Sequence, residues 1–139
     1  MDEETIVEIK KLNEEILNIV NKHSKKDRKI IFDDDFVFDQ SKHDLSEELI
    51  KNALLNGLHL EDRHLYPVNP NKKHKGKNYY CIYKYKKFIL SINYLLISYS
   101  KKYEKLILFH LSPLNYKSEE QRKYEEIQKS LKDLSSKKT

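Results

Sequence analysis

Three side chains of this sequence are of the types that catalyse reactions at a phosphate ester: His43, Arg63 and His110. Histidine titrates near neutral pH and serves as a general acid or base. Arginine presents a planar, permanently charged fork that suits a phosphate or another oxyanion. If the three side chains share one cleft, they form a candidate acid–base site.

Each of these residues also has a plain structural explanation. A histidine in front of a helix, as His43 is expected to be, is commonly an exposed loop residue. Arg63 is expected on a strand, where a surface ion pair with Glu61 contributes little to stability. His110 ends the last predicted strand and shares a face with Leu108, which favours a core position.

A second candidate site is the basic loop that runs into a tyrosine-rich strand. The loop spans residues 71–78, and the strand follows it directly. Lysines neutralise phosphates and tyrosine rings stack on unpaired bases, so this pattern suits RNA or single-stranded DNA. Alternatively, the loop is a solvated hairpin and the tyrosines cover the core. The candidate RNA-binding residues are Lys72, Lys73, His74, Lys75, Lys77, Tyr79 and Tyr83.

Composition narrows the classes of protein and partner. A chain of 139 residues suits one domain, and 27 basic against 22 acidic residues give a net charge of +5, a modest preference for polyanions. The sequence lacks a run of about 18 apolar residues, so no membrane partner is expected. The single cysteine, Cys81, excludes a disulfide framework and a cysteine zinc site, and we expect a cytoplasmic protein. We interpret Asp33–Asp35 as an exposed acidic turn and expect neither metal nor cofactor.

Hydrophobic periodicity predicts the elements that position these residues. A helix over residues 1–22 carries apolar residues at three- and four-residue steps. After a basic linker (residues 21–29), residues 30–38 suit a short strand or an extended arm. Asp44-Leu45-Ser46-Glu47 resembles a capping box, with Asp44 as the cap, and the helix that follows ends where Gly57 can adopt a left-handed conformation.

Four strands are predicted next, over residues 58–66, 78–85, 88–99 and 105–111, with joints short enough for antiparallel pairing. Pro113 is expected to end the last strand, and Ser118 to cap a helix within residues 117–134. The fold class is therefore α+β: a four-stranded antiparallel twisted sheet with an N-terminal helix, a second helix before the sheet and a C-terminal helix. Residues 1–139 form one domain, with its α+β core over residues 30–115.

The stretch SKHDLSEELIKNALLNG, followed by strands that end in ILFHLSP, resembles the toxin-like proteins of the barnase/EndoU/colicin/RelE superfamily, and its BrnT-like members in particular. The resemblance covers about residues 40–115. It implies a metal-independent endoribonuclease of toxin type, in which a base activates the ribose 2′-OH for attack on the adjacent phosphorus and an acid protonates the leaving 5′-oxygen. By position it assigns His43 as base or acid, Arg63 as phosphate stabiliser, Lys75 or Lys77 as auxiliary cation, and His110 as a second acid or base.

Two other classes of function stay open. A nucleic-acid-binding module would keep the basic loop and the tyrosines without catalysis. A protein-interaction domain, such as an antitoxin or immunity partner or a viral accessory protein, would dock through the first helix if its apolar stripe were exposed. An exposed edge strand over residues 58–66 would also permit a homodimer.

Overall fold

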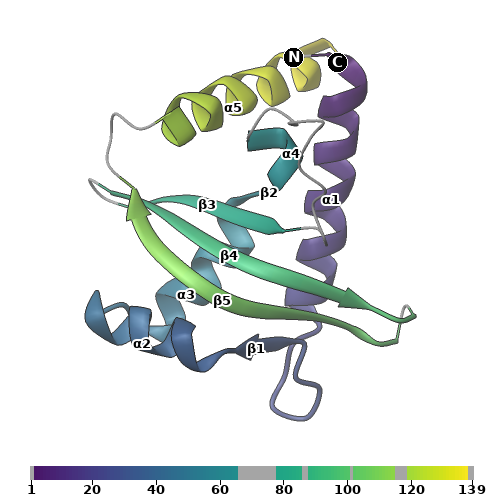
Figure 1. Cartoon of the computed structure of the whole chain (residues 1–139). Coiled ribbons are helices and arrows are strands. Elements are labelled where there is room, and N and C mark those ends of the chain that lie inside the picture. The colour runs from purple at the N-terminus through teal and green to yellow at the C-terminus, as the bar shows by residue number, and fades with distance from the viewer. Residues whose placement is uncertain (1, 66–77, 86–87, 101, 115–118, 138–139) are drawn as a thin grey trace, which may run out of the picture.

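A computed structural model describes residues 2–65, 78–85, 88–100, 102–114 and 119–137. They form an α+β fold around one five-stranded sheet of order β1-β5-β4-β3-β2 (Figure 1). The strands are β1 (Ile30–Phe32), β2 (Leu58–Glu61), β3 (Tyr79–Tyr85), β4 (Phe88–Ser98) and β5 (Glu104–Leu114). The helices are α1 (Glu3–Asn21), α2 (Asp34–Lys42), α3 (Glu47–Asn56), α4 (Asp62–Leu65) and α5 (Glu119–Lys137).

The four predicted strands are present and pair antiparallel in the predicted order. The predicted sheet lacked one strand, because β1 adds to it parallel to β5, with Ile30 opposite Leu106 and Phe32 opposite Leu108. The sheet is therefore mixed. Local sequence favours an extended β1, but its partner lies more than seventy residues away in the chain and is chosen by tertiary packing.

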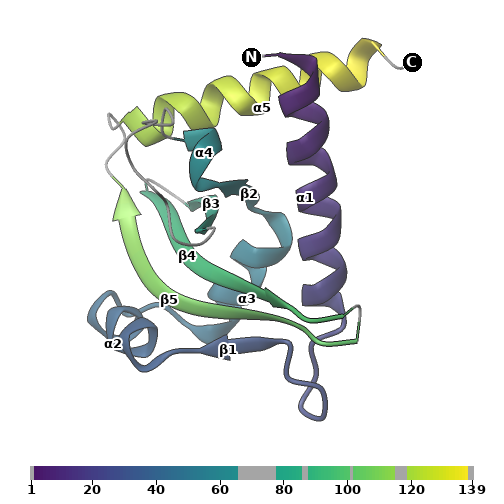
Figure 2. The same ribbon diagram turned by 45° about the vertical axis from the view of Figure 1, so that its right-hand side comes forward.

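The sheet is covered on both faces, but only in part on one of them (Figure 2). One face packs on α3, the C-terminal half of α1 and α2 around Phe36, Tyr94 and Ile92. The other packs on α5, whose Ile127 contacts a smaller cluster that includes Ile82. The apolar stripe of α1 is buried within these two clusters, as its periodicity predicted. Among the described residues, no helix is long and apolar enough to cross a membrane.

The segment after β1 is helical, which corrects the predicted extended arm and acidic turn. Asp33 is the N-cap residue of α2, and Asp34 and Asp35 form its first turn, where negative charge is favoured by the helix dipole. Phe36 is fully buried, whereas Phe38 is 69% exposed. Three apolar residues are too few to distinguish a helical face from a strand.

The start of α3 is also shifted from the prediction. Ser46, not Asp44, is the N-cap, and its side chain accepts a hydrogen bond from the Leu49 N–H. Asp44 instead has a φ of 52°, a left-handed conformation that aspartate tolerates better than most residues. It lies in the turn that separates α2 from α3.

Gly57 closes α3, but not in the predicted left-handed conformation, since its φ is -76°. A glycine is required there by space: a Cβ atom would lie 2.5 Å from the Ala53 carbonyl oxygen and 2.6 Å from Cys81 Sγ. The backbone of the helix end thus packs directly against β3.

Two strand ends differ from the prediction. The strand predicted over residues 58–66 ends at Glu61, and α4 follows. The last strand continues through Pro113, which is opposite Leu90, to residue 114. The Leu111 N–H points away from β4 and donates a hydrogen bond to Asp39 of α2. The backbone nitrogen of Pro113, two residues further along the strand, points to the same outer edge of the sheet. Beyond Leu108 no β1 residue pairs there, so the missing proline N–H removes no ladder hydrogen bond.

The C-terminal helix is confirmed over the described residues, with Tyr124, Ile127 and Leu131 packed inward. Ser118, its predicted cap, lies outside the described residues.

Candidate nucleic-acid interface

Arg63 is held by two carboxylates at the junction of α1, β2 and α4. Its Nη2 lies 2.8 Å from Glu8 Oε2, and its Nε lies 2.5 Å from Glu61 Oε2. The hydrogen bond that Arg63 donates to the Glu61 carboxylate raises the pKa of Arg63. His64 lies beside them, with its Nε2 buried 3.8 Å from Glu8 and its pKa lowered by burial. The predicted ion pair of Arg63 with Glu61 is confirmed, but the predicted position of Arg63 on a strand is wrong, because it lies in α4. Two carboxylates beside one guanidinium do not favour the binding of a phosphate.

The His110 side chain contacts Asp39 of α2, and the backbone of His43 is hydrogen-bonded to the carbonyl of the same residue. The His110 Nδ1 is 3.2 Å from Asp39 Oδ2, and the Asp39 carbonyl accepts a hydrogen bond from the His43 N–H. His43 is the C-cap of α2 and lines a pocket of about 470 Å³ with Leu49 and Leu90. Arg63 is not among the described residues that line this pocket. The structure thus pairs the His110 side chain with Asp39, places His43 at the end of the same helix, and places Arg63 in a different environment.

His110 does not share a face with Leu108, as the simple alternation predicted. A bulge in β5 pairs Asn93 with His110 and Tyr94 with Leu108, so Phe109 has no partner on β4. The extra residue turns His110 away from the core, and its side chain is 51% exposed. An interrupted alternation of this kind carries no clear signal in the sequence.

The tyrosines predicted to stack on bases lie in or against the core. Tyr79 is 7% exposed, and its ring stacks on Tyr94 with centroids 5.7 Å apart and an interplanar angle of 16°. Tyr83 is partly buried against the same cluster. Their alternative role as rings that cover the core is therefore correct. The predicted basic-loop residues, Lys72, Lys73, His74, Lys75 and Lys77, lie outside the described residues.

His59 is a buried histidine that the sequence analysis did not single out as a core residue. Its Nδ1 lies 2.8 Å from the Tyr94 hydroxyl and its Nε2 lies 2.8 Å from the Leu54 carbonyl oxygen. The carbonyl only accepts, so Nε2 carries the proton and Nδ1 accepts from Tyr94. Burial lowers the pKa of His59 to about 4. This fully satisfied neutral ring is a structural element rather than a catalytic one.

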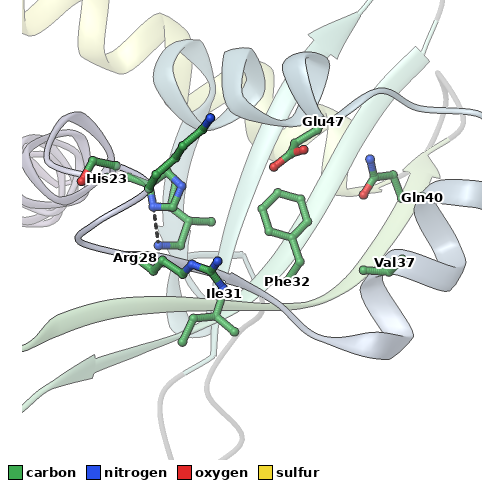
Figure 3. A pocket seen from close by; sticks show the side chains of 10 residues that line it. His23, Arg28, Ile31, Phe32, Val37, Gln40 and Glu47 are labelled. Atoms are coloured by element: carbon green, nitrogen blue, oxygen red, sulfur yellow. Dashed lines mark hydrogen bonds between the residues drawn. The ribbon is translucent and has the colours of Figure 1, made fainter.

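A larger hollow lies where the basic linker meets β1, α2 and the first turn of α3. We call it the basic cleft; its volume is about 670 Å³. Figure 3 shows the Phe32 ring in its middle, with His23 and Arg28 on one side and Gln40 and Val37 on the other. The lining residues are His23, Ser24, Lys25, Arg28, Ile30, Ile31, Phe32, Val37, Gln40 and Glu47.

The linker that forms the cationic wall is fixed by hydrogen bonds. The His23 Nδ1 accepts from the backbone N–H groups of Lys29 and Ile30, each at 3.1 Å. The Lys29 Nζ donates to the Lys102 carbonyl at 3.0 Å, which ties the linker to the turn between β4 and β5. The cationic wall is therefore anchored at its base, while Lys25 and Arg28 are exposed.

The cleft combines three kinds of group on separate walls. Lys25 and Arg28 supply positive charge on the linker side. Phe32 supplies an aromatic ring that is partly buried and packs edge-on against Phe36, with centroids 5.5 Å apart. Glu47 reaches toward that ring from α3 (Figure 3) and supplies a hydrogen-bond acceptor. Together these groups match a phosphate, a flat ring and a polar ring edge, which are the parts of a nucleotide.

The sequence contained one signal for this cleft. Six of the nine residues in the linker over residues 21–29 are lysine, arginine or histidine, the densest such run among the described residues. We interpreted it only as a connection between the first helix and the core, because nothing local shows that Phe32 and Glu47 face it.

No protein-family model matches this chain, and neither a curated protein nor a solved structure matches it.

Proposed function

We propose that the protein binds single-stranded RNA through the basic cleft. The observation that carries the proposal is that one cleft is lined by the cations Lys25 and Arg28, the Phe32 ring and the Glu47 carboxylate. Figure 3 shows Arg28 on one side of that ring and Glu47 close to it. Cationic side chains provide the phosphate contacts that dominate nucleic-acid affinity, and an aromatic ring provides a stacking surface for an unpaired base.

Glu47 and Gln40 supply polar groups for the edge of that base. A carboxylate accepts hydrogen bonds from amino and imino groups, and an amide both donates and accepts. Both side chains can contact only a base whose pairing edge is free. A base stacked on Phe32 must have left its helical stack, so the arrangement favours single strands over duplexes.

Fluorescence anisotropy with a labelled RNA oligonucleotide of mixed sequence, in EDTA, tests the proposal. Replacing both Lys25 and Arg28 with alanine should weaken binding at least tenfold. It should also reduce the slope of log K against log salt by about 1.5, because two phosphate contacts on a single strand are lost. The matched control replaces Lys10 and Lys11, which are exposed on α1, with alanine. This variant loses the same amount of positive charge.

If the cleft variant and the α1 variant lose the same RNA affinity, the loss is due to net charge alone, and the proposal is overturned. So would an absence of RNA binding by the wild-type protein at high concentration. A duplex of the same sequence should bind more weakly than the single strand, and Phe32→Leu should weaken binding of the single strand several-fold more than that of the duplex.

A second candidate function, RNA cleavage, is favoured by the contact between His110 and Asp39. A carboxylate on Nδ1 orients the ring and leaves Nε2 for proton transfer, an arrangement used in metal-independent acid–base catalysis. His43, the C-cap of α2, is the second candidate acid or base. Cleavage of RNA that persists in EDTA and is lost in His110→Asn supports this function, while intact RNA after prolonged incubation with concentrated protein removes it. Arg63→Gln in the same assay tests the predicted phosphate stabiliser.

A further inference from the structure

One part of the sheet presents apolar side chains in register across three strands. Ile31 of β1 is opposite Ile107 of β5, and Ile107 is opposite Leu95 of β4. Their chain neighbours on either side, such as Leu106 and Leu108, belong to the core on the other face. The row Ile31–Ile107–Leu95, which we call the open row, therefore lies on the face that α5 covers elsewhere.

The open row is accessible in the described structure. Leu95 is 40% exposed and Ile31 is 37% exposed, and neither belongs to the two described core clusters. The cluster under α5 reaches β4 at Ile89 and β3 at Ile82, well away from the row. Figure 1 shows α5 crossing one end of the sheet, while α3 lies against the opposite face. An apolar row on three strands is a feature typical of interaction surfaces.

Charges of opposite sign lie on the two sides of the open row, which crosses the strands. Lys105 precedes Ile107 by two residues on β5, so it lies on the same face, on the side of the row toward the amino end of β5. Asp33 follows Ile31 by two residues in extended backbone, with φ -67° and ψ 154°, on the side toward the carboxyl end of β1. Because β1 and β5 are parallel, one side of the row is cationic and the other is acidic.

We propose that this face binds a second copy of the chain, in a two-fold symmetric dimer. A two-fold axis that runs along the open row reverses the strand direction, so the row packs on its own copy and the cationic side of each copy faces the acidic side of the other. Isologous packing requires such a self-complementary surface, and two sheets pack face to face at about 10 Å through their side chains. This inference does not rest on the RNA-binding proposal, although the two surfaces meet at Ile31, which also lines the basic cleft. It also uses a different surface from the predicted edge over residues 58–66, where Leu58 and Leu60 are buried.

Light scattering coupled to size-exclusion chromatography, on the full chain without RNA, tests the dimer. The wild-type protein at tens of micromolar should have twice the 16.8 kDa chain mass, and Leu95→Glu should elute as a monomer. The matched control is Val7→Glu, which replaces another exposed apolar residue, 38% exposed on α1, and should remain a dimer. Circular dichroism establishes that both variants are folded.

Charge exchange tests the predicted two-fold arrangement. Lys105→Glu alone and Asp33→Lys alone should each weaken the dimer at least fivefold, and the double variant should restore it. The side chain of Asp33 makes no capping hydrogen bond, so α2 should tolerate its replacement. A monomeric wild type at these concentrations, or a Leu95→Glu dimer, would overturn the proposal. Failure of the double variant to restore the dimer would overturn the symmetric packing.

Discussion

Acidification should destabilise the protein through His59. The ring is buried and neutral in the folded state, where its pKa is lowered to about 4, against 6.5 for an exposed histidine. The unfolded chain therefore takes up a proton below pH 6.5 that the folded chain takes up only near pH 4. The stability conferred by the neutral ring is fully present above pH 6.5 and is lost as the pH falls toward 4.

The magnitude follows from these two pKa values. At about 1.4 kcal/mol per pH unit, the full loss is about 3 kcal/mol, of which about 2 kcal/mol has occurred by pH 5. This is a large part of the total for a single domain, which is roughly 5–15 kcal/mol. The free energy of unfolding, measured by urea denaturation and circular dichroism at pH 7.5, 6 and 5, gives the loss directly.

The His59→Gln variant separates this effect from the other titrating groups. Glutamine keeps a donor for the Leu54 carbonyl and an acceptor for the Tyr94 hydroxyl but does not titrate. Its stability should fall by about 2 kcal/mol less than that of the wild type between pH 7.5 and 5. If the variant does not fold, Tyr94→Phe provides a second measurement, with lower stability at pH 7.5 and the acid sensitivity retained. If the free energy of unfolding has the same pH dependence in the wild type and in His59→Gln, the acid sensitivity does not come from His59.

Three further predictions concern positions with tight or unusual geometry. Gly57→Ala should lower the free energy of unfolding by about 1–3 kcal/mol in urea denaturation, because the new methyl group meets the Ala53 carbonyl; an unchanged midpoint would contradict the packing. Cys81 should resist a thiol reagent in the native protein and react on unfolding, because burial raises its pKa and excludes the reagent; rapid native labelling would show that β3 is accessible. Asp44→Gly should raise the thermal midpoint by a few degrees, about 1 kcal/mol, by relieving the left-handed φ; a lower midpoint would assign Asp44 an unrecognised contact.

The sequence predicted those parts of the fold that repeat a pattern over several turns or residues. The stripe of α1 and the alternation in β4 extend over more than ten residues, so their elements and faces were correct. The helix α2 has only Phe36 buried, and the bulge at Phe109 shifts the alternation by one residue. Such short or interrupted patterns contain too little information to distinguish alternatives.

The candidate site was less predictable, for a different reason. The basic linker was visible in the sequence, but the cleft exists only because β1 pairs with a distant strand and α3 brings Glu47 opposite Phe32. In the same way, the arginine at position 63 suggested a phosphate site. In the structure its guanidinium contacts the carboxylate of Glu8, which α1 supplies from more than fifty residues away. Non-local partners of this kind decide what a charged side chain can bind.

RNA binding at the basic cleft can be located by backbone amide NMR in a titration with a short single-stranded RNA in EDTA. The largest chemical-shift changes should occur at Arg28, Phe32, Gln40 and Glu47, around the basic cleft. Changes that cluster instead at Asn78 and Tyr79, beside the predicted basic loop, or around Arg63 would contradict binding at the cleft.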